Sequence, residues 1–311
     1  MFEVPILFLI FNRPDTTKVV FEKLREIKPK YLYVAADGPR ASKEGEAELC
    51  GQTRAVIEDI DWDCEVKTLF REENLGCKAA VSSGIKWFFE NVEEGIILED
   101  DCLPSLSFFC FCQEMLEKYR HDTRIMHISG ENPINREICS KSYYFSRIPH
   151  IWGWASWRRA WNLYDVNFQG FETFIKFNMI QNVFEQKEAQ EYFNRIFTRV
   201  KNGEINTWDY QWTYALFVNN GLSINPMKNL VSNIGFGHQE ACHTSDNAKC
   251  ANRETFEIDE INHPLFVCPS KQAVDMILKE RYDIHKKTFL YLVNRELSRA
   301  FRKLVPNQNC G

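Results

Sequence analysis

The first 120 residues alternate short apolar segments with longer amphipathic ones, and this alternation constrains the fold more than any other feature. The apolar segments 4–11, 31–36, 64–70 and 95–98 have the length of strands, and segments with helical periodicity separate them. The first is continuously apolar, as expected of a strand buried on both faces. Because strands that alternate with helices pair in parallel through right-handed crossovers, the sequence predicts a mostly parallel, doubly wound α/β sheet.

The expected helices begin and end at residues that favour helix boundaries. Asp15 or Thr16 caps the first helix, and Pro29 ends it. Further helices are expected at 44–60, 75–91, 106–119, through most of 171–200 and at 270–303, with strands at 124–129, 221–224 and 230–234. Since neither a repeat nor a clear linker is visible, we expect one catalytic domain over residues 1–268 and a helical appendage over residues 269–311.

Composition excludes several classes of protein. The chain has 311 residues, 44% of them hydrophobic and 26% charged, which is ordinary for a soluble globular protein. The net charge of −5 argues against a general nucleic-acid-binding surface. The 11 cysteines form no CxxC pair, and neither a signal peptide nor a membrane-spanning segment is recognisable. We therefore expect a cytoplasmic protein with reduced cysteines.

Polar residues follow each of the four expected N-terminal strands. Arg13 follows the first strand, Asp37 the second, the segment 71–76 the third and the acidic triplet Glu99-Asp100-Asp101 the fourth. In open α/β sheets, ligands bind beyond the carboxyl ends of the strands. The four polar breaks therefore predict a single binding site along one edge of the sheet.

The acidic triplet is the strongest local signal for chemistry. Three adjacent carboxylates repel one another, and a hard divalent cation such as Mn²⁺ or Mg²⁺ relieves that repulsion with one or two carboxylate ligands plus phosphate oxygens. The alternative is a solvated acidic turn that caps the next helix. The position directly after a buried strand favours the metal site.

The other candidates are weaker when taken singly. The guanidinium of Arg13 suits a diphosphate, although an exposed arginine before a helix explains the same residue. Asp37 suits a ribose hydroxyl or a base N–H, but Asp-Gly-Pro is also a good turn sequence. Arg71 and Asn74 precede a helix and suit a nucleotide, with simple capping as the alternative.

Two further candidates lie in the second half of the chain. Asp209 stands between Trp208 and Tyr210 and suits a general base in a pocket, whereas a core helix with a capping aspartate is the alternative. His243, in a polar glycine-containing loop, is a candidate for phosphate or metal contact, although a lone loop histidine is more often neither.

Taken in order, these residues resemble the nucleotide-diphospho-sugar transferases of the GT-A fold, of the N-acetylglucosaminyltransferase I type, and bacterial sugar transferases of polysaccharide gene clusters. The resemblance covers about residues 1–250 and is carried by 6–13, Asp37-Gly38, 74–76, the acidic triplet, Gly153-Trp154, Trp208-Asp209 and 229–244. It implies a GT-A type, Rossmann-like sheet flanked by helices, with a helical C-terminal appendage. Tyr210 stands where the family has a second aspartate.

The resemblance also implies roles for the matching residues. Arg13 and Asp37 would hold the nucleotide, Asp100 would lie near the ribose, Asp101 would bind the metal, and Asp209 would be the catalytic base. The loop around His243 would close over the diphosphate. Trp152, Trp154 and Trp157 are candidates to stack on the acceptor sugar.

The implied reaction is an inverting transfer of a hexosyl or N-acetylhexosaminyl group, assisted by Mn²⁺ or Mg²⁺. The donor would be a nucleotide-diphosphate sugar, with UDP-sugars expected first, and the acceptor a glycan or a lipid-linked sugar. A metal-dependent nucleotidyltransferase is a rival, but the turn after the first strand lacks the glycines of that class. A non-catalytic nucleotide-sugar-binding module is the other rival.

The C-terminal segment is basic and amphipathic. From Lys279 to Lys303 it carries eight Lys or Arg residues against three Asp or Glu residues. Such a helix suits peripheral contact with an anionic membrane, here the inner face, near lipid-linked acceptors. An ordinary helix docked on the core is the alternative, and the one that we favour.

Overall fold

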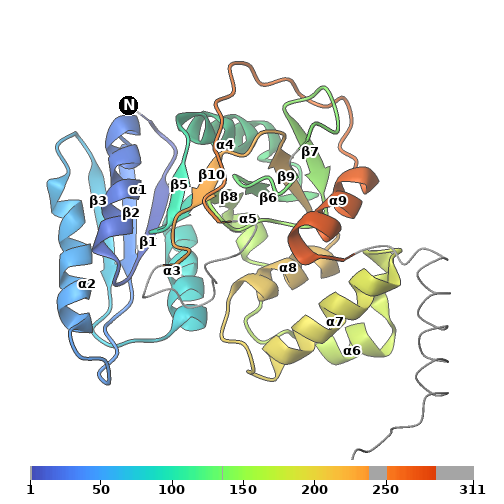
Figure 1. Ribbon diagram of the computed structural model, residues 1–311, viewed down its shortest axis with the longest axis horizontal. Helices are drawn as coiled ribbons and strands as arrows, with labels where there is room; N and C mark the ends of the chain where they lie inside the picture. The colour runs from blue at the N-terminus through green and yellow to red at the C-terminus, as the bar shows by residue number, and fades with distance from the viewer. Residues whose placement is uncertain (1, 135, 238–250, 285–311) are drawn as a thin grey trace, which may run out of the picture.

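The computed structural model describes residues 2–134, 136–237 and 251–284, and its centre is a twisted sheet (Figure 1). Within these residues the sheet has eight strands in the order β3-β2-β1-β4-β8-β6-β9-β7. The strands are β1 (Ile6–Ile10), β2 (Tyr31–Ala36), β3 (Glu65–Phe70), β4 (Glu94–Glu99), β6 (Ile125–Ser129), β7 (Tyr143–Ser146), β8 (Trp154–Trp157) and β9 (Leu222–Pro226). A small ribbon pairs β5 (Cys102–Pro104) with β10 (Val231–Asn233).

Most of the large sheet runs in one direction. Strands β3, β2, β1 and β4 pair in parallel, and β6 pairs with β9 in parallel. Strand β8 is antiparallel to both β4 and β6, and β7 is antiparallel to β9. The carboxyl ends of all strands except β7 and β8 therefore meet at one edge, and the predicted fold class, a mostly parallel sheet flanked by helices, is confirmed.

Helices cover both faces of the sheet. They are α1 (Pro14–Ile27), α2 (Glu46–Ala55), α3 (Cys77–Asn91), α4 (Leu106–Tyr119), α5 (Arg158–Trp161), α6 (Phe171–Lys176), α7 (Lys187–Lys201), α8 (Asp209–Val218) and α9 (Lys271–Tyr282), with 3₁₀ turns at Val56–Asp59 and Met179–Asn182. Apolar residues of α1 and α4 pack on one face, and those of α3 and α5 to α9 pack on the other. Figure 1 shows α6, α7 and α8 grouped at the lower right, below β6 and β9.

Alternation along the central strands produces these two cores. In β1, Leu7 and Leu9 face one core, whereas Ile6, Phe8 and Ile10 face the other. All five side chains are buried, since a parallel strand in the middle of a sheet has both faces covered. This burial on both faces explains why the sequence of β1 is continuously apolar.

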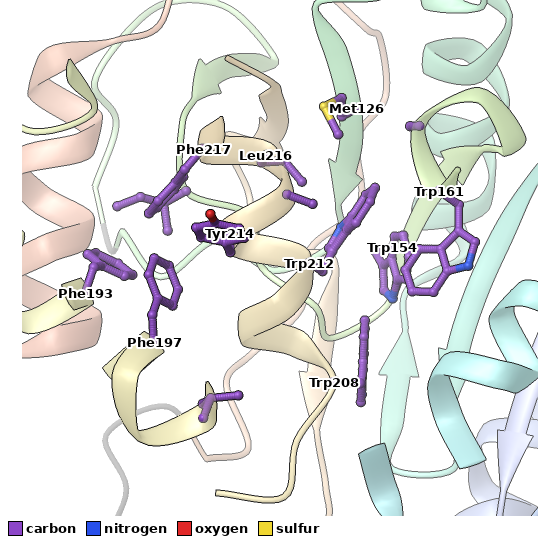
Figure 2. Packing of buried hydrophobic residues seen from close by; sticks show 14 of the residues in the cluster. Met126, Trp154, Trp161, Phe193, Phe197, Trp208, Trp212, Tyr214, Leu216 and Phe217 are labelled. Carbon is purple, nitrogen blue, oxygen red and sulfur yellow. The ribbon is translucent and has the colours of Figure 1, made fainter. Parts of the chain in front are cut away.

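A group of tryptophans joins α8 to the sheet (Figure 2). The ring of Trp154 in β8 lies 5.8 Å from each of the rings of Trp208 and Trp212, and 6.1 Å from that of Trp161. All four side chains are buried, and each close aromatic pair contributes about 0.5–1.5 kcal/mol beyond the area that it buries. This packing fixes the start of α8, where Asp209 lies, against the edge of the sheet.

The C-terminal part of the chain extends this core. Helix α9 begins after Ser270, whose side chain accepts a hydrogen bond from the backbone N–H of Ala273. Its apolar side packs into the same core as α7 and α8. Residues 285–303 of the expected C-terminal helix lie outside the described residues. In the part of the chain that the structure describes, no helix has both the length and the apolar character to cross a bilayer.

Candidate functional site

A cavity of about 770 Å³ opens at the carboxyl edge of the sheet. Its wall contains residues from each of the four predicted polar breaks, together with residues from the start of α8 and from the end of α9. The candidates that line it are Arg13, Asp37, Arg71, Asn74, Asp100, Asp101 and Asp209. The structure therefore gathers these seven side chains at one cavity, as the sheet topology requires. His243 lies outside the described residues.

Arg13 binds two members of the acidic triplet. Its Nη1 donates to Oδ2 of Asp101 over 3.0 Å, and its Nη2 forms an ion pair with Asp100. The backbone N–H of Phe11 donates to the other oxygen of Asp100 over 3.3 Å. Burial alone would lower the pKa of Arg13, but the two carboxylates more than offset it and raise that pKa. The guanidinium is therefore a fixed positive charge between the ends of β1 and β4.

Four carboxyl groups, those of Glu99, Asp100, Asp101 and Asp209, are crowded at one part of the cavity wall. Burial is the main cause that raises the pKa of Asp100 to about 6, against the opposing effect of Arg13. Burial also raises the pKa of Glu99 well above its usual value, and the charges of Asp101, Asp100 and Asp209 act in the same direction. The raised pKa values mean that crowding and burial disfavour full ionisation of these neighbouring carboxyl groups.

Asp209 is placed by the first turn of α8. Its Oδ1 accepts a hydrogen bond from the hydroxyl of Thr207, and its backbone oxygen accepts one from the hydroxyl of Thr213 over 3.1 Å. The side chain lines the cavity and lies close enough to Glu99 to raise the pKa of that carboxyl. A carboxylate held in this way has the placement that a general base needs.

The acidic residues fit a hard divalent cation only if a ligand supplies further oxygens. Among residues 2–134, 136–237 and 251–284, no three His, Cys, Asp or Glu side chains form a group arranged to hold a metal ion. The groups that face the cavity nevertheless include neighbouring carboxylate oxygens, which Mg²⁺ and Mn²⁺ prefer as ligands. Mg²⁺ sites commonly combine one or two carboxylates with substrate phosphates, and this donor set matches such a site.

Asp37 makes its contacts within the protein. Its carboxylate accepts hydrogen bonds from the backbone N–H groups of Gly38, Leu75 and Gly76, at 3.0–3.1 Å, and from the amide of Asn74 at 3.0 Å. The same Asn74 amide also donates to the backbone oxygen of Gly38 over 2.8 Å. Asp37 and Asn74 therefore tie the break after β2 to the break after β3 and form one wall of the cavity.

Two further arginines line this end of the cavity. Arg71 donates to the hydroxyl of Ser83 over 2.7 Å, and burial lowers its pKa. Arg40 was not among the candidates; its guanidinium pairs with the buried carboxylate of Glu46, which also accepts from the amide of Asn12 over 2.9 Å. Arg40 follows Asp37 by three residues, at the same edge of the sheet. This proximity is the sequence feature that could have identified it.

The small β5–β10 ribbon braces the acidic triplet from the other side. The backbone N–H of Ile234, just after β10, donates to the backbone oxygen of Asp101 over 2.8 Å. At the next residue, Gly235, a Cβ atom would lie 2.4 Å from Oδ2 of Asp101 and 2.7 Å from Nη1 of Arg13. Only a residue without a side chain lets the backbone approach the Arg13–Asp101 pair this closely.

The tryptophan candidates divide between core and cavity. Trp154 and Trp157 are buried in the two cores, whereas Trp152 lines the cavity. Tyr210 and Arg281 also line it, and neither was among the predicted site residues. Arg281 had no signal in the sequence, because its approach to the cavity depends on how α9 docks.

Comparison with known proteins gives structural neighbours only. No protein-family model and no curated protein matches the chain. Similar solved structures include HddC from Yersinia pseudotuberculosis (12% identity, 51% of this chain and 78% of that one, TM-score 0.32). Another is the galactosyltransferase LgtC in complex with donor and acceptor sugar analogues (11% identity, 70% of this chain and 86% of that one, TM-score 0.33). A third is S. aureus TarS 1-349 (10% identity, 73% of this chain and 59% of that one, TM-score 0.38).

Proposed function

We propose that this protein is a metal-dependent glycosyltransferase that moves a sugar from a nucleotide-diphosphate donor to a glycan or lipid-linked acceptor, with inversion. The observation that carries the proposal is the convergence of Arg13, the acidic triplet and Asp209 on one cavity at the carboxyl edge of the sheet. Such an arrangement supplies a cation site, positive charge for phosphates and a candidate base within one space of suitable size.

The donor nucleotide is assigned to the end of the cavity near β2 and β3. Arg40 and Arg71 lie there, and guanidinium groups suit phosphate and base edges. Asp37 and Asn74 contribute by shaping the wall, because their hydrogen bonds hold the two breaks together. UDP is the nucleotide that we expect first.

Asp101 is the proposed metal ligand, with Glu99 beside it in the same cavity. A bound Mn²⁺ or Mg²⁺ would supply positive charge to the departing diphosphate. Arg13 keeps Asp101 and Asp100 in place through its two ion pairs, and the close approach of Gly235 limits their movement. The protein thus holds its charged groups fixed before the reaction, which lowers the cost of reorganisation.

Asp209 is the proposed base that accepts the proton of the acceptor hydroxyl. The hydroxyl of Thr207 orients one carboxylate oxygen. The rigid tryptophan packing at the start of α8 keeps the carboxylate at the cavity wall. The acceptor is assigned to the space next to Asp209.

Binding of the donor nucleotide is tested by thermal shift with UDP, GDP, CDP and dTDP, each with and without Mn²⁺. We expect one nucleotide to stabilise the protein, and more strongly with Mn²⁺. Asp101→Asn should remove the Mn²⁺-dependent part, whereas Asp63→Asn should not, because Asp63 is exposed and lies before the start of β3, at the opposite edge of the sheet. The absence of a thermal shift with every one of these nucleotides would overturn the proposal.

Turnover separates an enzyme from a binding module. With the matching nucleotide sugars, Asp209→Asn should lower kcat by about 10²–10⁴-fold while the affinity for the nucleotide stays within a few-fold. The measurement is release of nucleoside diphosphate in single-turnover and steady-state assays. Nucleotide binding without any sugar transfer or hydrolysis would favour the binding-module alternative. Release of pyrophosphate from a nucleoside triphosphate and a sugar 1-phosphate, in a separate assay, would favour a nucleotidyltransferase.

A further inference from the structure

The end of the cavity opposite Arg71 contains an arginine that is held in place by two different contacts. The guanidinium carbon of Arg281 lies 4.2 Å from the centre of the Trp152 ring, and its Nη1 lies 3.8 Å from Oε1 of Glu131. The side chain of Arg281 is 22% exposed and lines the cavity, whereas that of Glu131 is 1% exposed. Arg281 therefore lies between a buried carboxylate and the cavity.

Glu131 has unusual surroundings for a buried carboxylate. Neither of its oxygens has a hydrogen-bond partner in the described residues, and burying a charge without such partners is costly. Arg281 faces it through an ion pair rather than a hydrogen bond. Glu131 follows β6, so its position at the carboxyl edge is fixed by the sheet.

The ring of Trp152 lies against the guanidinium of Arg281. Trp152 precedes β8, whose Trp154 pairs with Ile97 of β4, and continuing this register places Trp152 near the carboxyl end of β4. The ring is itself held edge-on by that of Phe236, at 5.5 Å. Arginine stacked on an aromatic face keeps its planar N–H fork, which matches carboxylate and phosphate groups.

Arg281 and the nucleotide end of the cavity lie beside strands that are far apart in the order of the sheet. Between β3, which precedes Arg71, and β8, which follows Trp152, there are four steps in the strand order. At about 4.8 Å a step, this corresponds to roughly 19 Å. A donor that occupies the β2–β3 end, with its diphosphate at the acidic triplet, would leave Arg281 beside the acceptor.

We propose that Arg281 is a specificity-determining residue that binds an anionic group, a carboxylate or a phosphate, on the acceptor sugar. Trp152 and Glu131 position the guanidinium for this purpose. The assignment to the acceptor rests on the proposed function, whereas the preference for an anionic sugar does not depend on it. Helix α9 then contributes directly to recognition at the cavity, through its last turn.

The test compares three sugars of similar size: methyl β-D-glucuronide, glucose 6-phosphate and neutral methyl β-D-glucoside. Their Kd values are measured by ligand-observed NMR, with the protein alone and with the protein saturated with UDP and Mn²⁺. We expect one of the two anionic sugars to bind about tenfold or more tightly than the neutral one, as a charged hydrogen bond would provide. Which anion is preferred distinguishes a sugar acid from a phosphorylated acceptor.

Three variants test whether Arg281 causes the preference for an anionic sugar. Arg281→Met should reduce it to less than about threefold, because methionine keeps contact with Trp152 but removes the charge. Lys279→Met is the matched control, since it removes the same charge from an exposed position of α9 and should leave the preference intact. Glu131→Gln should weaken the preference without changing the Kd of UDP, and thermal denaturation checks that each variant folds.

Three results would overturn the proposal. The first is equal Kd values, or no binding, for all three sugars, and the second is a preference for the anionic sugar that survives in Arg281→Met. The third is a loss of UDP affinity in Arg281→Met while the preference for the anionic sugar is unchanged. The last result would place the guanidinium on the donor diphosphate. Failure of all four nucleoside diphosphates to bind would instead remove the proposed function, while an anion preference of the protein alone would still stand.

Discussion

Single residues set the charge balance of the cavity, and Arg13 is the most important of them. It pairs with both Asp100 and Asp101, and its own side chain is 15% exposed. Removing a buried partner of this kind leaves uncompensated carboxylates, which costs more than the pair contributes. The residues around Arg13 are therefore constrained in shape as well as in charge, and Gly235 offers the sharpest way to test this.

Gly235→Ala should disturb the Arg13–Asp101 pair without touching the rest of the fold. The new Cβ would lie 2.4 Å from a carboxylate oxygen, so the pair must shift, at a cost of about 1–3 kcal/mol in unfolding free energy. Mn²⁺-dependent nucleotide binding should fall in the same variant. Gly51→Ala is the control, because a Cβ there meets nothing within 4 Å and alanine favours the α2 helix. Equal stability in the two variants would refute the prediction.

Buried histidines make the stability depend on pH. Burial lowers the pKa of His127 to about 3, and its ring accepts a hydrogen bond from Nε1 of Trp212 over 3.0 Å. Between pH 6.5 and 3 the unfolded chain binds a proton at this residue that the folded chain does not. The unfolding free energy should therefore fall as pH falls, by about 1.4 kcal/mol per unit from His127.

His150 acts in the same direction, because burial also lowers its pKa well below the usual value. Urea unfolding at pH 7.5, 6.5 and 5.5 measures the slope, and His127→Gln should reduce it by about 1.4 kcal/mol per unit below pH 6.5. Comparison of the two proteins cancels the contributions of the carboxylates that both share. An unchanged slope in His127→Gln would show that this ring titrates normally in the folded state.

At the scale of elements, the first half of the chain was predictable and the second half less so. The expected segments 31–36 and 106–119 coincide with β2 and α4, because local periodicity and boundary residues determine both. Strands β7 and β8 were not predicted as strands, since they are short and their sheet neighbours lie far away in the sequence. The segment 171–200 is mostly helical, as expected, and consists of α6, the 3₁₀ turn Met179–Asn182 and α7.

The candidate site was predictable to a similar degree. Residues that follow parallel strands must meet at one edge, which is why Arg13, Asp37 and Asp101 share a cavity. Bonding partners were not predictable, so the internal hydrogen bonds of Asp37 came only from the structure. The contribution of Arg281 depends on the docking of α9, about which periodicity says nothing. The division at residue 268 stays a prediction, although α9 packs into the main core.

Docking of α9 should contribute measurably to global stability. Ile277 is fully buried among residues of the core that also contains α7 and α8. Truncating it in Ile277→Ala should lower the unfolding free energy by about 2–5 kcal/mol. Gln272→Ala, at an exposed position of the same helix, should change it by less than about 0.5 kcal/mol. If Ile277→Ala unfolds at the same urea concentration as the parent protein, α9 is only loosely attached.

For the whole molecule, one continuous sheet should make unfolding cooperative. Each of the two apolar cores contains residues from both halves of the chain: Leu7 and Trp212 share one, and Phe8 and Ile224 share the other. Neither half can lose its packing without exposing apolar surface of the other. We expect urea transitions followed by far-UV circular dichroism and by tryptophan fluorescence to coincide. Two separated transitions would show that the halves fold as independent units.

The tryptophan group at the start of α8 also gives the protein an intrinsic fluorescence signal for ligand binding. Trp208 lines the cavity, and its ring lies within 6 Å of that of Trp154, which in turn contacts Trp161 and Trp212. Excitation absorbed by any of these indoles can migrate among them before emission. Occupation of the cavity beside Trp208 would therefore change the light emitted by the whole group, and ligand entry can be followed in real time without any label.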